Sequence, residues 1–306
     1  MYKNRPSLKF KLLFVYIGVL IILGAIFLLS TFSSFNSLNT ALDQASPVNT
    51  QQPVIIPIIE TPTATPFQPE ASTVMTTPSL SIWYPLPAIP NDYRGLITNG
   101  NRSEHKVALT FDLCQSEGDL AGYDNEIIRV LNETQTPATF FAGGEWMRDH
   151  QTEILNLAAN PLFEIGNHSW SHPDFSAITI DEMKTEIILT QQFMYDLLGY
   201  QTNLFRLPFG TYTEEALNVI GENGLYIIQW EVVSGDPDPN INAESMTKWV
   251  LQQVQPGSII IMHANGRGWH TAEALPTIIQ SIRQQGYTLV TIPELLGIQS
   301  PKKVSP

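Results

Sequence analysis

The segment FEIGNHSWSHPDF, residues 163–175, joins a short apolar run to two histidines four positions apart. On a helix His168 and His172 would share one face. The segment does not favour a helix, because a glycine and an asparagine interrupt the apolar run and Pro173 disfavours helical geometry at the residue before it. The segment therefore predicts a strand that ends in a loop, with both imidazoles in the loop.

Short apolar runs alternate with amphipathic segments from Val107 onward. This alternation is typical of parallel strands joined by crossover helices. About seven strands in one domain of this size indicate an α/β fold, a deformed (β/α) barrel or an open doubly wound sheet. Strands are expected at 107–111, 138–142, 163–167, 204–208, 225–233, 258–263 and 287–292, and helices at 125–134, 180–198, 213–224 and 272–286.

Polar, chemically capable residues stand where the predicted strands end. They are Asp112, His168, Arg206, Asp236 and His263. Each has an ordinary structural interpretation, such as a turn aspartate or a hydrogen-bonded histidine. In β/α barrels, however, the carboxyl ends of the strands carry the active site. This pattern favours the barrel and a common site, in which two histidines and a carboxylate suit a zinc-like ion with an open position.

The first third of the chain has a different composition. Residues 12–30 are apolar and uncharged, long enough to cross a bilayer as one helix. Basic residues precede them, which favours a cytoplasmic N-terminus and an extracytoplasmic position for the rest of the chain. A cleaved signal peptide, and hence a secreted protein, is the alternative. Residues 31–79, rich in Ser, Thr, Gln and Pro, are expected to form a disordered spacer.

These features predict a single-pass protein of the cell membrane, with the lipid bilayer as a partner. The net charge of −13 argues against nucleic-acid binding, and a single cysteine, Cys114, excludes an intrachain disulfide. The expected segments are a cytoplasmic N-terminus (1–11), a transmembrane helix (12–30), a linker and lead-in (31–104), a folded domain (105–297) and a C-terminal tail (298–306).

The motifs ALTFD, GNHSWSH, FRLPFG, QWEVVSGD and IIIMH occur in this order along the folded domain. In order and spacing the sequence resembles the polysaccharide deacetylases, the family four carbohydrate esterases, from about residue 105 to 297. The resemblance implies a deformed β/α barrel, a divalent metal and hydrolysis of acetyl groups on glycans. Zn²⁺ is the expected metal, with Co²⁺, Mn²⁺ or Ni²⁺ as alternatives.

The resemblance also implies roles for the residues that bind metal and activate water. Asp112 is similar to the family's general base, and Arg206 to the arginine that orients this base. His168 and His172 resemble the two metal-binding histidines.

A second group of residues resembles those that complete the reaction. His263 is similar to the general acid, and Asp236 to the carboxylate that pairs with it. The backbone N–H of Phe209 matches the family's oxyanion donor. Trp230 stands where an aromatic side chain commonly lines the site.

Three positions depart from the family pattern. Leu113 replaces the second of two consecutive aspartates, which is a metal ligand, Pro237 replaces a frequent aromatic residue, and Phe209 replaces a frequent tyrosine. The loop after the first strand offers Glu117, Asp119 and Asp124 as a substitute ligand. We choose Asp124, with helix capping alone as the competing interpretation.

A membrane-anchored, extracytoplasmic, metal-dependent deacetylase is the expected function. A tethered module outside a bacterial cell meets the cell wall first, so N-acetyl groups of peptidoglycan are the expected substrate, with chitin-like or xylan-like glycans as alternatives. Two other functions stay open: a catalytically impaired glycan-binding module, which Leu113 favours, and a metal-dependent amidase acting on another substrate.

Overall fold

The computed structural model describes residues 86, 89, 95–115 and 121–300, within a compact unit that spans Thr76–Pro306. The predicted segments 1–11 and 12–30, most of the linker, Glu117, Asp119 and the last residues of the tail lie outside the described residues. Within the described residues, no helix is both long enough and apolar enough to cross a membrane.

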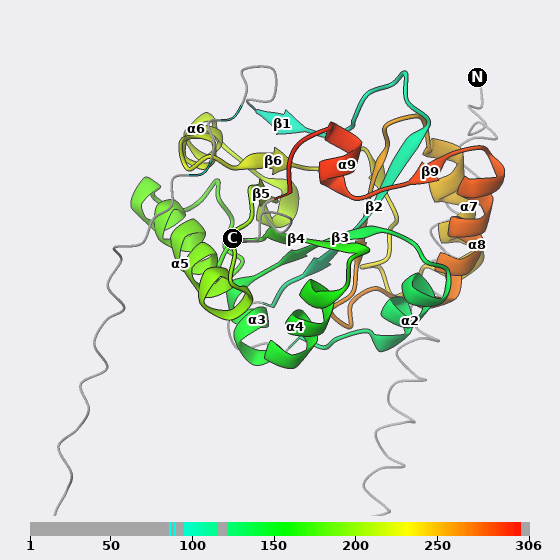
Figure 1. The fold of residues 1–306 in the computed structure, drawn as a ribbon, viewed down its shortest axis with the longest axis horizontal. Coiled ribbons are helices and arrows are strands. Elements are labelled where there is room, and N and C mark those ends of the chain that lie inside the picture. The colour runs from blue at the N-terminus through cyan, green and yellow to red at the C-terminus, as the bar shows by residue number, and fades with distance from the viewer. Residues whose placement is uncertain (1–85, 87–88, 90–94, 116–120, 301–306) are drawn as a thin grey trace, which may run out of the picture. The chain divides into compact units, whose positions relative to one another are not determined.

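A nine-stranded sheet, in which every named strand pair is parallel, forms the centre of the fold (Figure 1). The longest strand, β2, lies between β3 and β8 and also pairs with β9. The order is β1 (Leu96–Ile97), β6 (Tyr226–Ile228), β5 (Leu204–Phe205), β4 (Phe163–Asn167), β3 (Ala138–Ala142), β2 (Lys106–Leu113), β8 (Ile259–His263) and β7 (Val232–Val233), with β9 at Thr288–Leu289.

The predicted strand 225–233 is two strands that belong to opposite ends of this order. β6 pairs with β1 and β5, whereas β7 pairs with β8. Only residues 229–231 separate them, and the N–H of Gln229 donates to Ile97 O at 2.8 Å while that of Glu231 donates to Ile259 O at 3.3 Å. The sheet therefore curls until its two ends meet across one short link, which favours a deformed barrel over an open sheet.

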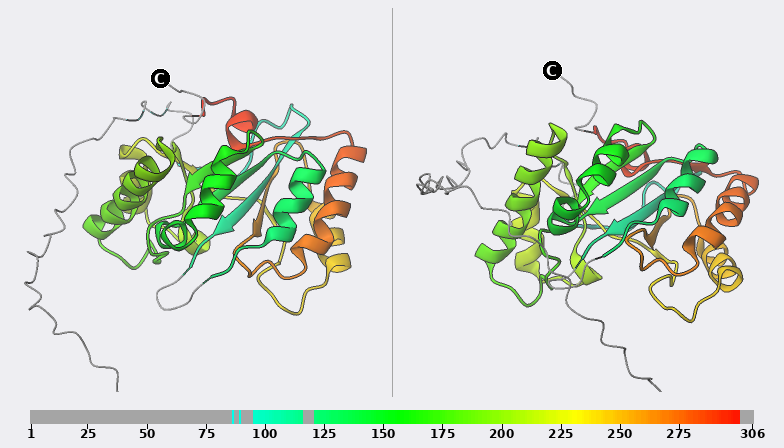
Figure 2. Two further views of the ribbon diagram at one scale, coloured as in Figure 1. Left: turned by 60° about the horizontal axis from the view of Figure 1, so that its bottom comes forward. Right: turned by 90° about the horizontal axis from the view of Figure 1, so that it is seen from below.

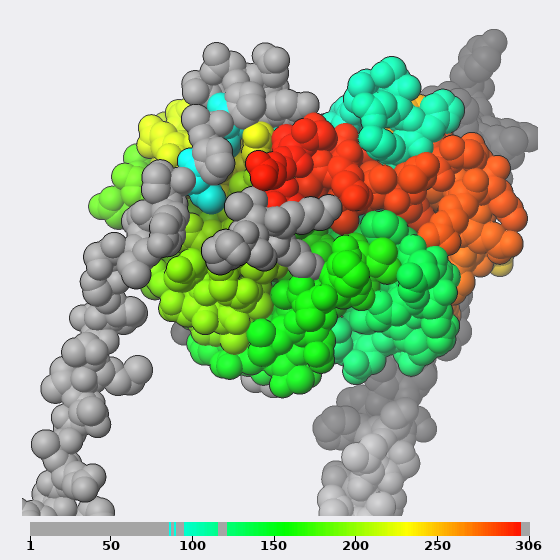
Figure 3. Space-filling view, viewed as in Figure 1, coloured from blue at the N-terminus to red at the C-terminus, as the bar shows by residue number. Residues whose placement is uncertain are grey.

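Helices pack outside the curled sheet (Figure 2). They are α2 (Asn125–Glu133), α3 (Gly144–Asp149), α4 (Gln151–Ala159), α5 (Ile180–Leu198), α6 (Glu214–Glu222), α7 (Ala243–Gln253) and α8 (Thr271–Gln284), whereas α9 (Ile292–Leu296) packs on the inner face of the sheet. Of these, α3, α4, α7 and α9 were not predicted from the sequence. The red segment in Figure 3, which includes α9, lies on the face shown there, although most residues of α9 are buried.

Side chains of β2 alternate between two apolar clusters. Leu109, Phe111 and Leu113 join the cluster that also contains residues of α2, α4 and α8. Ala108 joins a second cluster, with Phe141 of β3, Ile259 of β8 and residues of α9. Successive residues of a strand point to opposite faces, so even-numbered residues of β2 face the inside of the curled sheet.

The sheet includes residues that precede residue 105. β1 lies within the segment expected to be linker and lead-in, yet it extends the sheet beside β6. Asn99 forms a bridge to Ser258, and the N–H of Gly100 donates to Gly257 O at 2.8 Å. These contacts join sequence-distant segments, so no local sequence pattern predicts them.

We expect a chain that starts at residue 80 to unfold cooperatively, because it keeps the whole described sheet. A chain that starts at residue 105 should have a lower melting temperature, because it lacks β1 and the Arg102–Glu231 ion pair. Thermal denaturation followed by circular dichroism compares the two. Equal melting temperatures would remove β1 from the folded domain.

Candidate active site

Asp112 and His263 lie side by side at the carboxyl ends of two neighbouring strands. Asp112 of β2 is the register partner of His263 of β8. Asp112 is buried, with 3% of its surface exposed, whereas His263 is partly accessible. Parallel pairing thus places a carboxylate and an imidazole at the same level of the sheet.

Arg206 is fully buried directly after β5 and holds Asp112 in place. Its Nη1 donates to Asp112 Oδ1 at 2.8 Å, its Nε to Ile228 O at 3.2 Å, and its Nη2 to Gln229 O at 3.4 Å. The guanidinium carbon lies 4.0 Å from the centroid of the Phe141 ring. Burial acts to raise the pKa of Asp112, but the charge of Arg206, the neighbouring imidazoles of His168 and His263, and the hydrogen bond from Arg206 together lower the pKa below its usual range. Asp112 is therefore a carboxylate at neutral pH.

Asp236 fixes the orientation and the charge of His263. Its carboxylate accepts hydrogen bonds from His263 Nδ1 at 2.9 Å, from His263 N at 2.7 Å, and from the hydroxyls of Ser234 and Thr271, both at 2.9 Å. Burial acts to lower the pKa of His263, but the hydrogen bond to Asp236 and its charge outweigh burial and raise the pKa. With Nδ1 engaged, Nε2 is the nitrogen able to exchange a proton.

The loop after β4 carries both predicted metal-binding histidines, as expected. It is held by Glu186 of α5, whose carboxylate accepts the N–H groups of Trp170 and Ser171 at 2.7 and 2.8 Å. The backbone of His172 has a φ of 60°, in the left-handed region. This turn brings the two imidazole centroids to 4.9 Å.

The donor atoms of this loop fit a divalent metal. His168 Nδ1 donates to Arg206 O at 2.9 Å, which leaves Nε2 for a ligand. The Nδ1 atom of His172 is buried and has no hydrogen-bond partner within the described residues. Burial lowers the pKa of both imidazoles, that of His172 to about 3, so both are neutral, the form that binds metal.

Cys114 joins the two histidines, and Asp124 does not. One ligand atom from each of Cys114, His168 and His172 lies within 4.8 Å of the others. Asp124 instead caps α2, where its Oδ1 accepts the N–H of Ile127 at 3.4 Å, which is the competing role considered for it. The alternation of side chains along a strand is the sequence signal that could have identified Cys114, because Cys114 stands two residues after Asp112 and therefore on the same face.

Aromatic residues stand beside the histidine loop. Phe209, in the turn after β5, has a φ of 57° and 63% of its surface exposed, and its ring centroid lies 4.5 Å from that of His172. Trp230 lies in the link between β6 and β7, 5.5 Å from the Arg206 guanidinium. A non-glycine residue held at positive φ indicates a backbone that is fixed by its surroundings. The N–H of Phe209 stays a predicted oxyanion donor.

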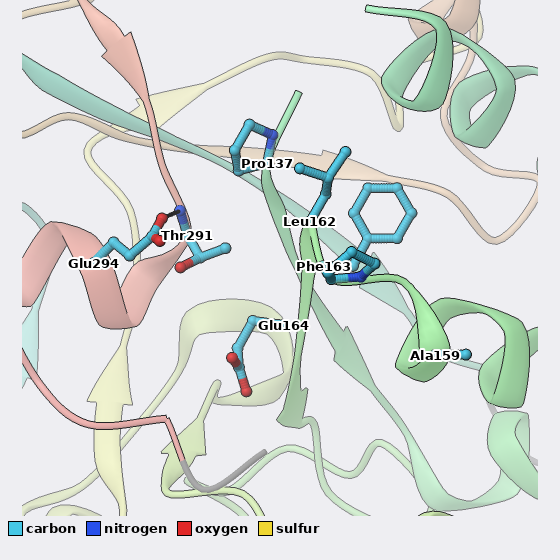
Figure 4. Close-up of a pocket in the computed structure, with 8 residues that line it drawn as sticks. Pro137, Ala159, Leu162, Phe163, Glu164, Thr291 and Glu294 are labelled. Carbon is cyan, nitrogen blue, oxygen red and sulfur yellow. Dashed lines mark hydrogen bonds between the residues drawn. The ribbon is translucent and has the colours of Figure 1, made fainter. Parts of the chain in front are cut away.

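A separate pocket of about 290 Å³ opens at the other end of the strands (Figure 4). Its lining includes Pro137 before β3, Glu164 in β4 and Thr291 before α9. None of the predicted site residues lines it. The polar groups at the carboxyl ends, and not this pocket, therefore form the candidate active site.

We expect Arg206→Met to destabilise the fold by about 3–5 kcal/mol, because it leaves the buried Asp112 carboxylate without its cation. The double variant Arg206→Met/Asp112→Asn should recover part of this loss, because both charges are then absent. Urea denaturation measures both. A double variant no more stable than the single one would show that the ion pair is not the source of the loss.

If turnover requires protonated His263, activity should fall as pH rises through the raised pKa of this residue, above the usual histidine value of about 6.5. Asp236→Asn should move this fall in activity to lower pH, because the substitution removes the negative charge that raises the pKa of His263. Ser234→Ala is the matched control, since it removes one donor to Asp236 but keeps the charge. A profile of kcat/KM against pH measures the shift, and identical limbs in all three proteins would contradict the assignment.

Known proteins with similar sequences carry the same kind of domain. The family model of polysaccharide deacetylases matches residues 99–228. A peptidoglycan-N-acetylglucosamine deacetylase of Bacillus cereus is 31% identical over 207 residues, which cover 67% of this chain and 73% of that protein. The peptidoglycan-N-acetylmuramic acid deacetylase PdaA of Bacillus subtilis is 31% identical over 202 residues, which cover 64% and 73%.

Solved structures agree with the sequence relatives. The crystal structure of the Bc1960 peptidoglycan N-acetylglucosamine deacetylase has a TM-score of 0.62 at 29% identity, over 68% of this chain and 95% of that one. BA3943 of Bacillus anthracis, a CE4 family pseudoenzyme, has a TM-score of 0.59 at 25% identity, over 66% and 69%. The predicted family is confirmed: this chain belongs to the polysaccharide deacetylases, the CE4 carbohydrate esterases, which hydrolyse carbon–nitrogen bonds other than peptide bonds.

Proposed function

We propose that this protein is a metal-dependent deacetylase that removes N-acetyl groups from peptidoglycan at the outer face of the cell membrane. The observation that carries the proposal is the register pairing of Asp112 with His263 next to the His168–His172 loop. Asp112 Oδ2 lies 3.5 Å from His168 Nε2, so a base, an acid and two metal-binding nitrogens share one end of the barrel.

His168 and His172 would hold the divalent metal. When bound, such an ion polarises the acetyl carbonyl and lowers the pKa of water from about 15.7 towards about 7. Asp112 takes the proton of the attacking water, and its ion pair with Arg206 keeps it in the ionised form that this role requires.

Cleavage of the carbon–nitrogen bond needs an oxyanion donor and an acid. The backbone N–H of Phe209 is assigned to the oxyanion, a contact worth about 3–4 kcal/mol when well placed. His263 donates a proton from Nε2 to the departing sugar nitrogen, while Asp236 keeps its ring oriented and stabilises its charged form. The products are acetate and a free amino sugar.

Peptidoglycan is the substrate that the relatives favour. The proteins from Bacillus cereus and Bacillus subtilis are named as deacetylases of its N-acetylglucosamine and its N-acetylmuramic acid. The exposed Phe209 ring gives this chain an apolar surface beside the site on which a sugar ring can stack. The apolar segment 12–30 would anchor the enzyme in the membrane that faces this polymer.

An inactive glycan-binding module is the second candidate function. Leu113 stands in the family's metal-ligand position, and the chain is similar in structure to the pseudoenzyme BA3943. A mutant of BA3943 with restored enzymatic activity is also similar, at 26% identity and a TM-score of 0.59 over 66% of this chain and 71% of that one. The acid and base geometry of this chain favours the enzyme.

Acetate release from peptidoglycan and from acetylated chito-oligomers tests the proposal. We expect release by the full-length protein, loss of release with a chelator, and recovery when Zn²⁺ is added. Asp112→Asn and His263→Ala should each lower kcat by about 10²–10⁴-fold, because each removes one proton transfer, while both keep metal bound. Glycan binding without acetate release would favour the binding module, and near-wild-type turnover in either variant would remove that residue from the mechanism.

A further inference from the structure

We propose that the thiolate of Cys114 is the third protein ligand of the metal, so that this chain has a Cys–His–His site. The inference deepens the proposed function, because it concerns the metal on which that function rests. It assigns a role to the only cysteine of the chain and accounts for the loss of the family's second aspartate.

Strand alternation directs Cys114, and not Leu113, towards the histidines. Leu113 has no exposed surface and belongs to the apolar cluster that also holds residues of α2, α4 and α8. Asp112, its neighbour, faces Arg206 and His168 on the other side of the sheet. Cys114 is even-numbered like Asp112 and therefore shares its face. Leu113 has no donor atom and therefore supplies no ligand.

Sheet register places Cys114 and His168 at the same level. Leu113 pairs with Ala142, and Ala142 pairs with Asn167. The residues that follow these are Cys114, Gly143 and His168, and the backbone stays paired there, since His168 N donates to Ala142 O at 3.1 Å. Gly143, between the two, has no side chain to separate them. The thiol and the imidazole can therefore approach each other across β3.

The environment of Cys114 is polar, unlike that of a cysteine that only fills a core. It belongs to none of the apolar clusters formed by the described residues. Asn265 Nδ2 donates to Cys114 O at 2.7 Å and lies 3.5 Å from its Sγ. An amide N–H at this position would orient a sulfur ligand, as outer groups commonly do for metal ligands.

Two neutral imidazoles and one thiolate make a donor set typical of zinc sites. Catalytic zinc commonly has three protein ligands and one open position, and thiolate favours Zn²⁺ over harder ions such as Mg²⁺ and Mn²⁺. The three donor atoms lie within 4.8 Å of one another, whereas ligands of a tetrahedral zinc with Zn–N and Zn–S bonds of about 2.0 and 2.3 Å lie roughly 3.3–3.7 Å apart, so only small side-chain shifts would be needed.

Cobalt(II) binding to the full-length protein tests the inference without any turnover. A thiolate ligand gives cobalt(II) a charge-transfer band in the near ultraviolet that nitrogen and carboxylate ligands do not give. Because Cys114 is the only cysteine, this band can come from no other residue. We expect the wild-type protein to show the band at one cobalt per chain and to lose it when Zn²⁺ displaces cobalt.

Variants separate the possible third ligands. Cys114→Ala should lose the band and bind Zn²⁺ more than about 100-fold more weakly, beyond the 10–100-fold typical of losing an outer partner. Cys114→Asp should restore much of the affinity without the band. Asp124→Ser, which keeps a helix cap, should bind cobalt and show the band like wild type, because Asp124 caps α2 and lies outside the metal group.

Three results would overturn the inference: cobalt bound by wild type without the band, no cobalt binding at all, or unchanged affinity in Cys114→Ala. A loss of affinity in Asp124→Ser without a loss in Cys114→Ala would transfer the role to Asp124. These outcomes are distinct from failure of the proposed function. Acetate release without the band removes only the Cys114 assignment, whereas the band without acetate release removes only the deacetylase.

Discussion

The buried ion pair between Arg206 and Asp112 is the interaction on which the rest of the site depends. A guanidinium with no exposed surface needs a carboxylate partner, and a carboxylate inside a barrel needs a cation. Arg206 extends from the end of β5, past the Phe141 ring of β3, to Asp112 of β2. The pair therefore fixes three strand ends relative to one another. The same contact keeps Asp112 ionised, so the burial requirement and the chemistry of a base are met together.

Curling of the sheet connects this pair to the acid. The segment that leaves β6 supplies Ile228 O and Gln229 O as acceptors for Arg206. A few residues later the same segment pairs with β8 and supplies Asp236, which orients His263. One stretch of chain thus supports both Arg206, which binds the base Asp112, and Asp236, which raises the pKa of the acid His263. In an open sheet, the segment that binds Arg206 and the segment that carries Asp236 would lie at opposite edges of the sheet. The curl therefore brings their groups into a single site.

Patterns that depend on neighbouring residues were predictable from the sequence. β3, β4 and α5 occupy the predicted ranges, because their apolar periodicity and end signals are local, as in the capping box of Thr179 and Glu182 at the start of α5. β1, the division of 225–233 and the small helix α9 depend on pairing with distant segments, which no local pattern encodes. In the site, Asp112, Arg206, His168, His263 and Asp236 were predicted because each stands at or near a strand end, and His172 because it lies four positions after His168. The structure places these residues at one end of the barrel.

The structure places the thiol of Cys114, and not the carboxylate of Asp124, beside the two metal-binding histidines, and this placement depends on side-chain direction along β2. Leu113 has no exposed surface and packs in the apolar cluster that also holds residues of α2, α4 and α8. One residue further along, the chain returns to the face of Asp112 and presents Cys114 beside His168 and His172. Neighbouring residues of a strand face opposite sides of the sheet, so a shift of one residue moves a side chain from the core to the site. A hydrophobic residue in a family's ligand position is therefore weak evidence that the metal has been lost.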